Sequence, residues 1–245
     1  MKMKKMKRFL ISGLLAGCWA ACNSNDYKMY SGEAYIQFSE TKDTLQRYSF
    51  YFQPEQVTED TVWFEVITTG YTSSDPRSFK VVQGQIEGQN NAVAGEQYKF
   101  FDEMNYSVEA GSVKARVPVV IFRNKLAERT TYYLRLEIVE NDFFKTGVKT
   151  ELHRTVVFSK DLLKPAGWGG YLESVVLGPY SINKHMWMIE QTGKKWDDEF
   201  LTALNDEPGS DMYWRDKLNE YLLEYNRQGN ILLDDDNREI TGFPE

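Results

Sequence analysis

Two cysteines near the start of the chain, Cys18 and Cys22, are the residues whose setting points most directly to chemistry. They follow a basic head with five Lys and Arg residues and a short apolar run, Phe9–Gly17. A basic head, a short apolar run and small residues are typical of a secretion signal. The run is too short to cross a bilayer as a helix. Leu15-Ala16-Gly17-Cys18 fits the bacterial lipobox, in which the cysteine is lipidated and becomes the new N-terminus.

The choice between the two cysteines stays open on the sequence. Cys18 has the better local motif, whereas Cys22 is preceded by Trp19-Ala20-Ala21. Cys22, however, gives a longer apolar run and stands directly before polar residues 23–26. One of the two is the predicted lipidation site. We therefore expect a lipoprotein signal peptide over residues 1–22 and a polar tether over residues 23–33, with a membrane attachment through lipid.

Ser181 and Lys184 have the Ser-x-x-Lys spacing of penicillin-binding enzymes and serine β-lactamases, in which the lysine supports a serine nucleophile. Lys145-Thr146-Gly147 resembles the strand triplet of those enzymes, but it precedes the serine here and follows it there. The interpretation that we favour is that Ser181 begins a helix as its N-cap. No catalytic residue and no enzymatic activity are predicted.

Metal and cofactor sites are not indicated either. The two histidines, His153 and His185, do not belong to a zinc-ligand spacing. The acidic run 234–239 offers oxygen ligands, but it lacks the glycine at the sixth position of a calcium-binding loop. A solvated turn is the favoured interpretation of that run. We expect no metal and no cofactor.

Aromatic residues are frequent after residue 165, where they can stack on sugar rings, anchor a protein interface or fill a core. Most of them recur at helical spacing, for which the core is the usual place. Trp168 and Tyr171 do not, and they are flanked by three glycines at positions 167, 169 and 170. These two residues are the predicted exposed ligand contacts.

The first part of the chain, residues 34–163, has the alternation of apolar and polar residues that is typical of strands. Val62, Phe64 and Val66 share one face of such a strand. About eight short strands with no helical pattern between them predict an antiparallel, Ig-like β-sandwich, for which the uneven spacing argues against a closed barrel. The expected strands are 34–38, 48–52, 61–67, 79–82, 106–108, 113–121, 131–139 and 153–158.

The second part, residues 164–245, changes to a helical period after the break Lys164–Gly167. Three helices are expected around residues 182–189, 196–204 and 214–225, followed by a terminal β-hairpin around the acidic run. The predicted fold class is therefore mainly β, a sandwich followed by a small α-rich cap.

Composition narrows the choice of partners. The 245 residues carry a net charge of −7, and an acidic surface repels phosphate backbones, so nucleic acid is not an expected partner. No cysteine follows Cys22, which excludes disulfides, thiolate metal sites and thiol nucleophiles from the body of the chain.

Several motifs together carry a resemblance over nearly the whole chain. They are Tyr35-Ile36-Gln37-Phe38, Gly178-Pro179-Tyr180-Ser181 with Lys184, Tyr221–Asn226 and Gly242-Phe243-Pro244. With them the chain resembles an uncharacterised family of Bacteroidetes lipoproteins whose genes commonly neighbour SusC/SusD-type nutrient importers. The resemblance implies an outer-membrane lipoprotein that faces the cell surface, and it brings no catalytic residue.

A second resemblance concerns residues 92–138, which look like a Calx-beta sandwich repeat. The matching positions are Ala94-Gly95, Tyr98, Ala110-Gly111, Glu128 and Tyr133–Leu136. Such repeats can bind calcium through an Asp pair ahead of the glutamate, where this chain has Arg123-Asn124.

These observations favour a lipid-anchored, non-enzymatic accessory or binding subunit of a SusC/SusD-like uptake system, with a glycan or a peptide as its ligand. The alternatives are a surface hydrolase acting on glycan or peptide and a purely structural envelope lipoprotein.

Overall fold

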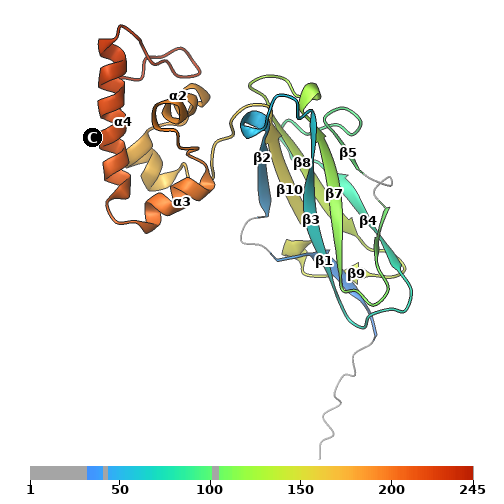
Figure 1. Cartoon of the computed structure of the whole chain (residues 1–245). Coiled ribbons are helices and arrows are strands. Elements are labelled where there is room, and N and C mark those ends of the chain that lie inside the picture. The colour runs from blue at the N-terminus through green and yellow to red at the C-terminus, as the bar shows by residue number, and fades with distance from the viewer. Residues whose placement is uncertain (1–31, 41–43, 101–104, 245) are drawn as a thin grey trace, which may run out of the picture. The chain divides into compact units, whose positions relative to one another are not determined.

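The computed structural model describes residues 32–40, 44–100 and 105–244 (Figure 1). The chain divides into two units, residues 1–33 and 34–245, and the structure below is that of the second. The predicted lipidation sites Cys18 and Cys22, the signal peptide and most of the tether lie outside the described residues.

Two five-stranded sheets form a β-sandwich, as the alternation of the sequence predicts. The first sheet has the order β5-β7-β3-β1-β9 and the second the order β2-β10-β8-β4-β6. The strands are β1 (Tyr35–Phe38), β2 (Leu45–Ser49), β3 (Glu59–Thr69), β4 (Arg77–Gly84), β5 (Tyr98–Phe100), β6 (Asn105–Val108), β7 (Lys114–Phe122), β8 (Thr131–Val139), β9 (Lys145–Thr146) and β10 (His153–Ser159).

The expectation of purely antiparallel sheets is wrong at two edges. β1 pairs with β9 in parallel, and β2 pairs with β10 in parallel, while the other pairs are antiparallel. The cause is the path of the chain, which leaves the first sheet after β1 and continues in the second sheet as β2. The predicted strand 48–52 accordingly ends at Ser49, and Phe50–Phe52 form a 3₁₀ turn.

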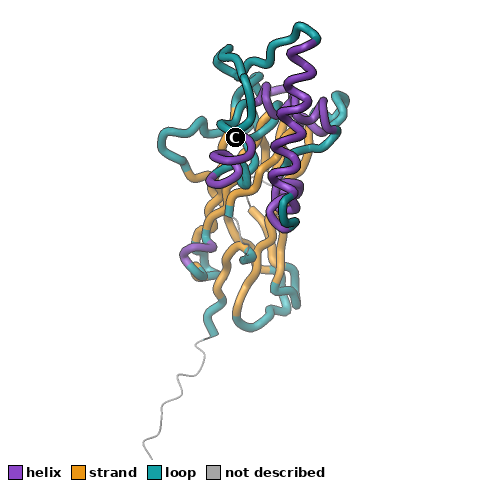
Figure 2. The backbone as a smooth tube through the Cα atoms, turned by 90° about the vertical axis from the view of Figure 1, so that its left-hand side faces the viewer, coloured by secondary structure: helices purple, strands orange, loops and turns teal. Residues whose placement is uncertain are grey.

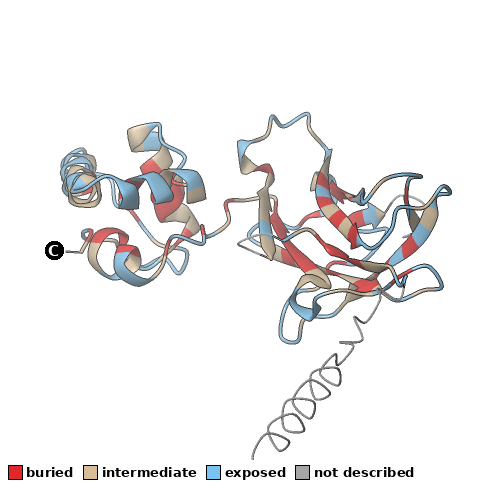
Figure 3. Ribbon diagram, turned by 90° about the horizontal axis from the view of Figure 1, so that it is seen from below, coloured by how far each residue is buried: buried red, intermediate tan, exposed pale blue. Residues whose placement is uncertain are grey.

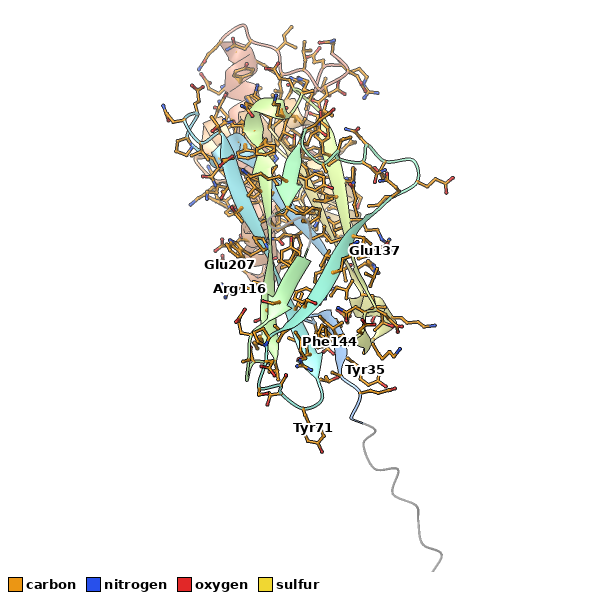
Figure 4. All side chains as sticks on the ribbon, turned by 90° about the vertical axis from the view of Figure 1, so that its right-hand side faces the viewer. Tyr35, Tyr71, Arg116, Glu137, Phe144 and Glu207 are labelled. Atoms are coloured by element: carbon orange, nitrogen blue, oxygen red, sulfur yellow. The ribbon has the colours of Figure 1, made fainter. Side chains whose placement is uncertain are left out.

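The core of the sandwich follows from the alternation of side chains along each strand (Figure 3). In β3, Val62, Phe64 and Val66 are buried between the sheets, while Trp63 on the opposite face is 54% exposed. Tyr71, in the turn after β3, is 74% exposed and projects away from the strands (Figure 4).

In the described residues, the α-helices lie in the C-terminal part, while short 3₁₀ turns also occur in the sandwich (Figure 2). They are α2 (Ile182–Thr192), α3 (Asp198–Asp206) and α4 (Ser210–Arg227), preceded by the π-helical turn η5 (Leu172–Leu177). The second predicted helix starts later than expected, because Trp196 takes a left-handed φ of 54° and Asp197 caps α3 by accepting from the Phe200 N–H. The predicted terminal hairpin is reduced to one bridge, Leu233 to Glu239.

A second hydrophobic cluster holds the helices together and shares no residue with the core of the sandwich. Its largest side chains include Trp168, Trp187 and Trp196. The two clusters fall on either side of residue 163, and a domain boundary there stays a prediction. Within the described residues, the helices are too short or too polar for any of them to span a bilayer.

One ion pair is buried at an end of the sandwich. Arg154 is 5% exposed and donates to the backbone oxygens of Ser39 (2.6 Å) and His153 (2.7 Å) and to the carboxylate of Glu151. Since Ser39 follows β1 and Arg154 belongs to β10, this side chain links the two sheets.

We expect Glu151→Gln to lower the free energy of unfolding by about 2 kcal/mol, because a buried guanidinium loses its charged acceptor. The hydrogen bond from Arg154 also holds the pKa of Glu151 below its ordinary value. The carboxylate therefore stabilises the fold at neutral pH, and this contribution is lost as the pH falls below about 4. Urea denaturation at pH 7 and pH 3 measures both effects.

The matched control is Glu128→Gln, which removes the exposed ion pair with Lys160 at 3.1 Å. Its expected effect is below about 0.5 kcal/mol at either pH. Equal losses for the two variants at pH 7 would contradict a structural role for the buried pair.

Candidate functional site

The two aromatic residues that the sequence indicates as ligand contacts differ in their exposure. Trp168 is completely buried, so the expectation that its ring is exposed is wrong. Its Nε1 donates to the Gly178 oxygen at 3.0 Å, and its ring packs edge-on against Tyr180. Tyr171 is 50% exposed, and its hydroxyl donates to Asp211 Oδ2 at 2.8 Å. A ligand contact at Tyr171 stays a prediction.

Ser181 and Lys184 do not form a nucleophile and its base. The Ser181 hydroxyl accepts from the Lys184 backbone N–H at 3.0 Å, which is the geometry of the predicted N-cap. The Lys184 Nζ instead donates to the oxygens of Leu177 (3.0 Å) and Pro179 (2.7 Å). Burial lowers the pKa of Lys184 to about 8. The amine therefore ties the turn before α2 to the helix.

His185 is also a buried member of this cluster. Its Nε2 lies 2.8 Å from the Lys195 oxygen, so it carries the proton and donates. Burial lowers the pKa of His185, which favours the neutral ring. Burial likewise lowers the pKa of the other histidine, His153.

The acidic run is a tight turn that caps a helix. Asp234 accepts through its side chain from the backbone N–H groups of Asp236 and Arg238. Asp235 accepts from the N–H groups of Ile182 (2.7 Å) and Asn183 (3.0 Å) at the start of α2. The carboxylates of Asp234 and Asp235 thus accept hydrogen bonds from backbone N–H groups of the protein itself. In the described part of the chain, His, Cys, Asp and Glu do not gather in groups of three or more that could hold a metal ion.

A groove of about 350 Å³ opens on the side of the sandwich where β1 ends. It combines one exposed aromatic ring, that of Trp63, with polar and charged side chains. The lining residues are Ser39, Glu40, Thr44, Gln46, Trp63, Phe64, Glu65 and Arg154.

The groove lies beside β3, beyond the described end of the much shorter strand β1 (Figure 1). β1 pairs with β3 only from Val66 to Thr69, whereas β7 pairs with β3 from Glu59 to Ile67. Within the described residues, the stretch of β3 from Glu59 to Phe64 is therefore paired on one side only. The opposite wall of the groove comes from the second sheet, through Thr44 and Gln46.

Two hydrogen bonds join the sheets through strands that line the groove or through residues next to them. The Tyr48 hydroxyl of β2 donates to Asp60 of β3. Arg154 of β10 donates to the Ser39 oxygen. The lining also includes Phe64, which belongs to the core.

Two carboxylates, Glu40 and Glu65, line the groove. Glu65 Oε1 accepts from Lys114 Nζ at 3.1 Å, and this hydrogen bond is the main cause that lowers the pKa of Glu65. A second hydrogen bond, from the Ser39 side chain, acts in the same direction. Glu65 is therefore ionised at neutral pH and can only accept hydrogen bonds there.

Sequence reasoning did not single out Trp63, although a signal was present. Once Val62, Phe64 and Val66 are assigned to the buried face, the alternation places Trp63 on the outer face with Thr61 and Glu65. A tryptophan on the outer face of a strand is the pattern that could have found it.

A second hollow, of about 450 Å³, lies along α4, but no aromatic side chain lines it. Its lining consists of Arg215, Asp216, Asn219, Leu222, Leu223, Asn226 and Thr241. Of these two surfaces, the groove at Trp63 is the one that offers an aromatic ring as well as polar and charged side chains.

A family model described as "Domain of unknown function (DUF4843)" matches residues 26–194. The chain belongs to this family. The matched range contains every residue that lines the groove at Trp63, and it ends before α3. A search of curated proteins found no match to the chain.

Several solved structures that are similar to this chain come from Bacteroides. A candidate carbohydrate-binding protein of Bacteroides ovatus is 14% identical, with 52% of this chain and 37% of that chain covered and a TM-score of 0.38. A two-domain protein of unknown function from Bacteroides fragilis is 8% identical, with 64% and 51% covered and a TM-score of 0.40. EndoBT-3987 of Bacteroides thetaiotamicron, solved with a Man5GlcNAc product, is 14% identical, with 51% and 30% covered and a TM-score of 0.36.

The similarity to these structures is partial. The chain spans less than two thirds of the length of each of these three chains. The functional argument therefore rests on the residues of the groove.

Proposed function

We propose that the protein is a lipid-anchored, non-enzymatic accessory subunit of a SusC/SusD-type nutrient-uptake system. It is held at the outer membrane, facing the cell surface, and it binds a glycan or peptide ligand in the groove at Trp63. The observation that carries the proposal is the exposed Trp63 ring, which lies on β3 and lines a groove with polar and charged side chains. Large aromatic side chains of this kind are typical anchors of a bound partner.

The state of Glu65 favours binding over hydrolysis by this carboxylate. A glycosidase needs one carboxylic acid whose pKa is raised, so that it can donate a proton to the leaving group. The hydrogen bonds to Glu65 lower its pKa instead. A carboxylate in this state can accept hydrogen bonds from sugar hydroxyls or peptide N–H groups, and it cannot act as the acid.

The lipobox supports the anchoring part of the proposal. We expect only one of the two single variants, Cys18→Ser or Cys22→Ser, to move from the membrane pellet to the soluble fraction. The thiol that carries the lipid is essential, and the other cysteine has no part in attachment. Fractionation of cells that express each full-length variant measures this. Retention of both single variants and of the double variant in the membrane would contradict lipid anchoring through these residues.

The partner is tested separately. The full-length chain is expected to co-purify with a SusC/SusD-like pair from detergent-solubilised outer membranes. Migration as a free monomer at native expression would contradict the accessory role. A purely structural lipoprotein would be anchored in the same way, but Trp63→Ala would not change its binding to any glycan or peptide.

A further inference from the structure

We propose that the hollow along α4 is a second ligand site, which binds a segment of a neutral glycan. The inference goes beyond the proposed function, which places a ligand in the groove at Trp63. Every residue that lines the hollow follows residue 194, where the match to the family model ends. The second site therefore belongs to the part of the chain beyond the matched range.

One side of the hollow is a flank of α4. The lining residues other than Thr241 lie between Arg215 and Asn226. Their spacing, mostly three or four residues, places them on the same side of the helix. At a rise of 1.5 Å per residue, they follow α4 for about 16 Å. The hollow is thus elongated along the helix.

The opposite side is the segment near the C-terminus of the described chain, at Thr241. The Phe243 N–H donates to Asn219 Oδ1 at 2.8 Å, which ties this segment to α4. Phe243 is only 3% exposed, and its ring stacks on that of Trp187 with 6.0 Å between the centroids. The segment is thus held against the helices by its backbone and by a buried ring.

The charged pair in the lining is neutral as a whole and keeps hydrogen-bonding capacity. Arg215 donates through Nε (3.0 Å) and Nη2 (2.8 Å), and both bonds end on the same oxygen, Asp216 Oδ1. Within the part of the chain that the structure describes, no hydrogen bond engages Asp216 Oδ2, Arg215 Nη1 or the side chain of Asn226. These planar groups offer a ligand both donors and acceptors.

An apolar strip lies between the charged pair and Asn226. Leu222 is almost completely buried at the bottom of the hollow, whereas Leu223 is 54% exposed. A sugar ring combines an apolar face of C–H groups with a rim of hydroxyl groups, so it matches a lining that alternates in this way. The volume of about 450 Å³ lies within the range that is typical of small-ligand sites, roughly 300–1,000 Å³.

Other ligand classes fit the hollow less well. The backbone N–H and C=O groups inside α4 bond within the helix, so a peptide cannot pair with them as it pairs with a strand edge. An amphipathic peptide helix needs an apolar stripe, and the hollow offers two leucines. An acidic glycan is disfavoured because the charge of Arg215 is already matched by Asp216.

The experiment uses the full-length Trp63→Ala chain in detergent, so that binding in the groove at Trp63 is weakened, and a panel of immobilised neutral and acidic oligosaccharides. Neutral members are expected to bind in preference to acidic ones. Asn226→Ala, added to this background, is expected to weaken their binding about tenfold, the loss of roughly one hydrogen bond. Asp216→Asn is expected to raise the binding of acidic members, because the charge of Arg215 is then unmatched.

Glu220→Gln is the matched control. Glu220 also belongs to α4 and pairs with Lys217 at 2.6 Å, but it does not line the hollow, so glycan binding is expected to stay unchanged. Leu223→Trp tests the site in the opposite direction. Its indole adds a ring on which a sugar can stack, and binding is expected to become about fivefold tighter.

Both Asn226 and Leu223 are exposed, so these substitutions leave the hydrophobic cluster of the helices intact. Three results would overturn the second site. They are a Trp63→Ala chain that binds no neutral oligosaccharide, equal binding by Asn226→Ala and Glu220→Gln, and a preference of the Trp63→Ala chain for acidic oligosaccharides.

The two sites fail separately. Ligand binding in the groove at Trp63 is measured as the difference between the wild type and Trp63→Ala, and none of the three results changes that difference. Equal binding of the panel by the wild type and Trp63→Ala would count against a glycan in the groove at Trp63, and it would leave the site along α4 intact.

Discussion

Trp168→Ala is expected to lower the free energy of unfolding of the helical part by about 3–5 kcal/mol. The indole is completely buried in the hydrophobic cluster, and its ring packs against Tyr180 and His185. Truncation leaves a large cavity and also removes the hydrogen bond from Nε1 to the Gly178 oxygen. Urea denaturation followed by far-UV circular dichroism measures the loss through the helical signal.

Tyr171→Ala is the matched control, three residues further along. Its ring is half exposed and its hydroxyl makes one hydrogen bond at the surface, to Asp211. The expected loss is about 1 kcal/mol or less. Similar losses for the two variants, or a stable Trp168→Ala protein, would contradict the burial of Trp168.

The stability of the helical part is expected to rise between pH 8 and pH 10.5, because Lys184 loses its buried charge there. Burial lowers the pKa of Lys184 from 10.5 to about 8. In this interval the unfolded chain binds a proton that the folded chain does not, and stability therefore rises with pH. The gain is about 3 kcal/mol, from roughly 1.4 kcal/mol for each pKa unit.

Other groups titrate in the same interval, so the measurement is the difference between the wild type and Lys184→Met. Methionine has a similar length and no charge. The stability of the wild type relative to this variant is expected to rise with pH. Thermal melts at several pH values measure this difference. Lys217→Met serves as the control, because Lys217 is partly exposed and pairs with Glu220, which raises the pKa of Lys217. The wild type is therefore not expected to gain stability relative to Lys217→Met between pH 8 and pH 10.5. A constant difference between the wild type and Lys184→Met would contradict a buried charged amine.

Much of the fold could be predicted because strand alternation and helix capping are local signals. Val62, Phe64 and Val66 lie on the buried face of β3 as expected, and Ser181 caps α2 as expected. The sheet order and the parallel edge strands could not be predicted, since they depend on where the chain crosses between sheets. β9 consists of only Lys145 and Thr146, which is too short to leave a pattern.

The candidate site was harder to predict than the fold. The groove at Trp63 lies beside β3, beyond the described pairing of β1, and no sequence motif records where that pairing ends. The expectation for Trp168 failed because flanking glycines indicate a turn and say nothing of burial. Gly167 in fact packs close to Leu201, where an added Cβ would lie 3.2 Å from the Leu201 Cβ. A turn can thus lie against a core.

The short strand β1 has a mechanical consequence. A chain anchored through its N-terminus, as we propose, transmits tension first to β1, the first strand of the sandwich. β1 is bonded on both sides, to β3 and to β9. Under a force directed along β1, these bonds are loaded in shear and share the load, whereas bonds at the end of a hairpin would open one after another. On the proposed anchoring, β1 is therefore the strand that carries the load from the tether into the body of the protein.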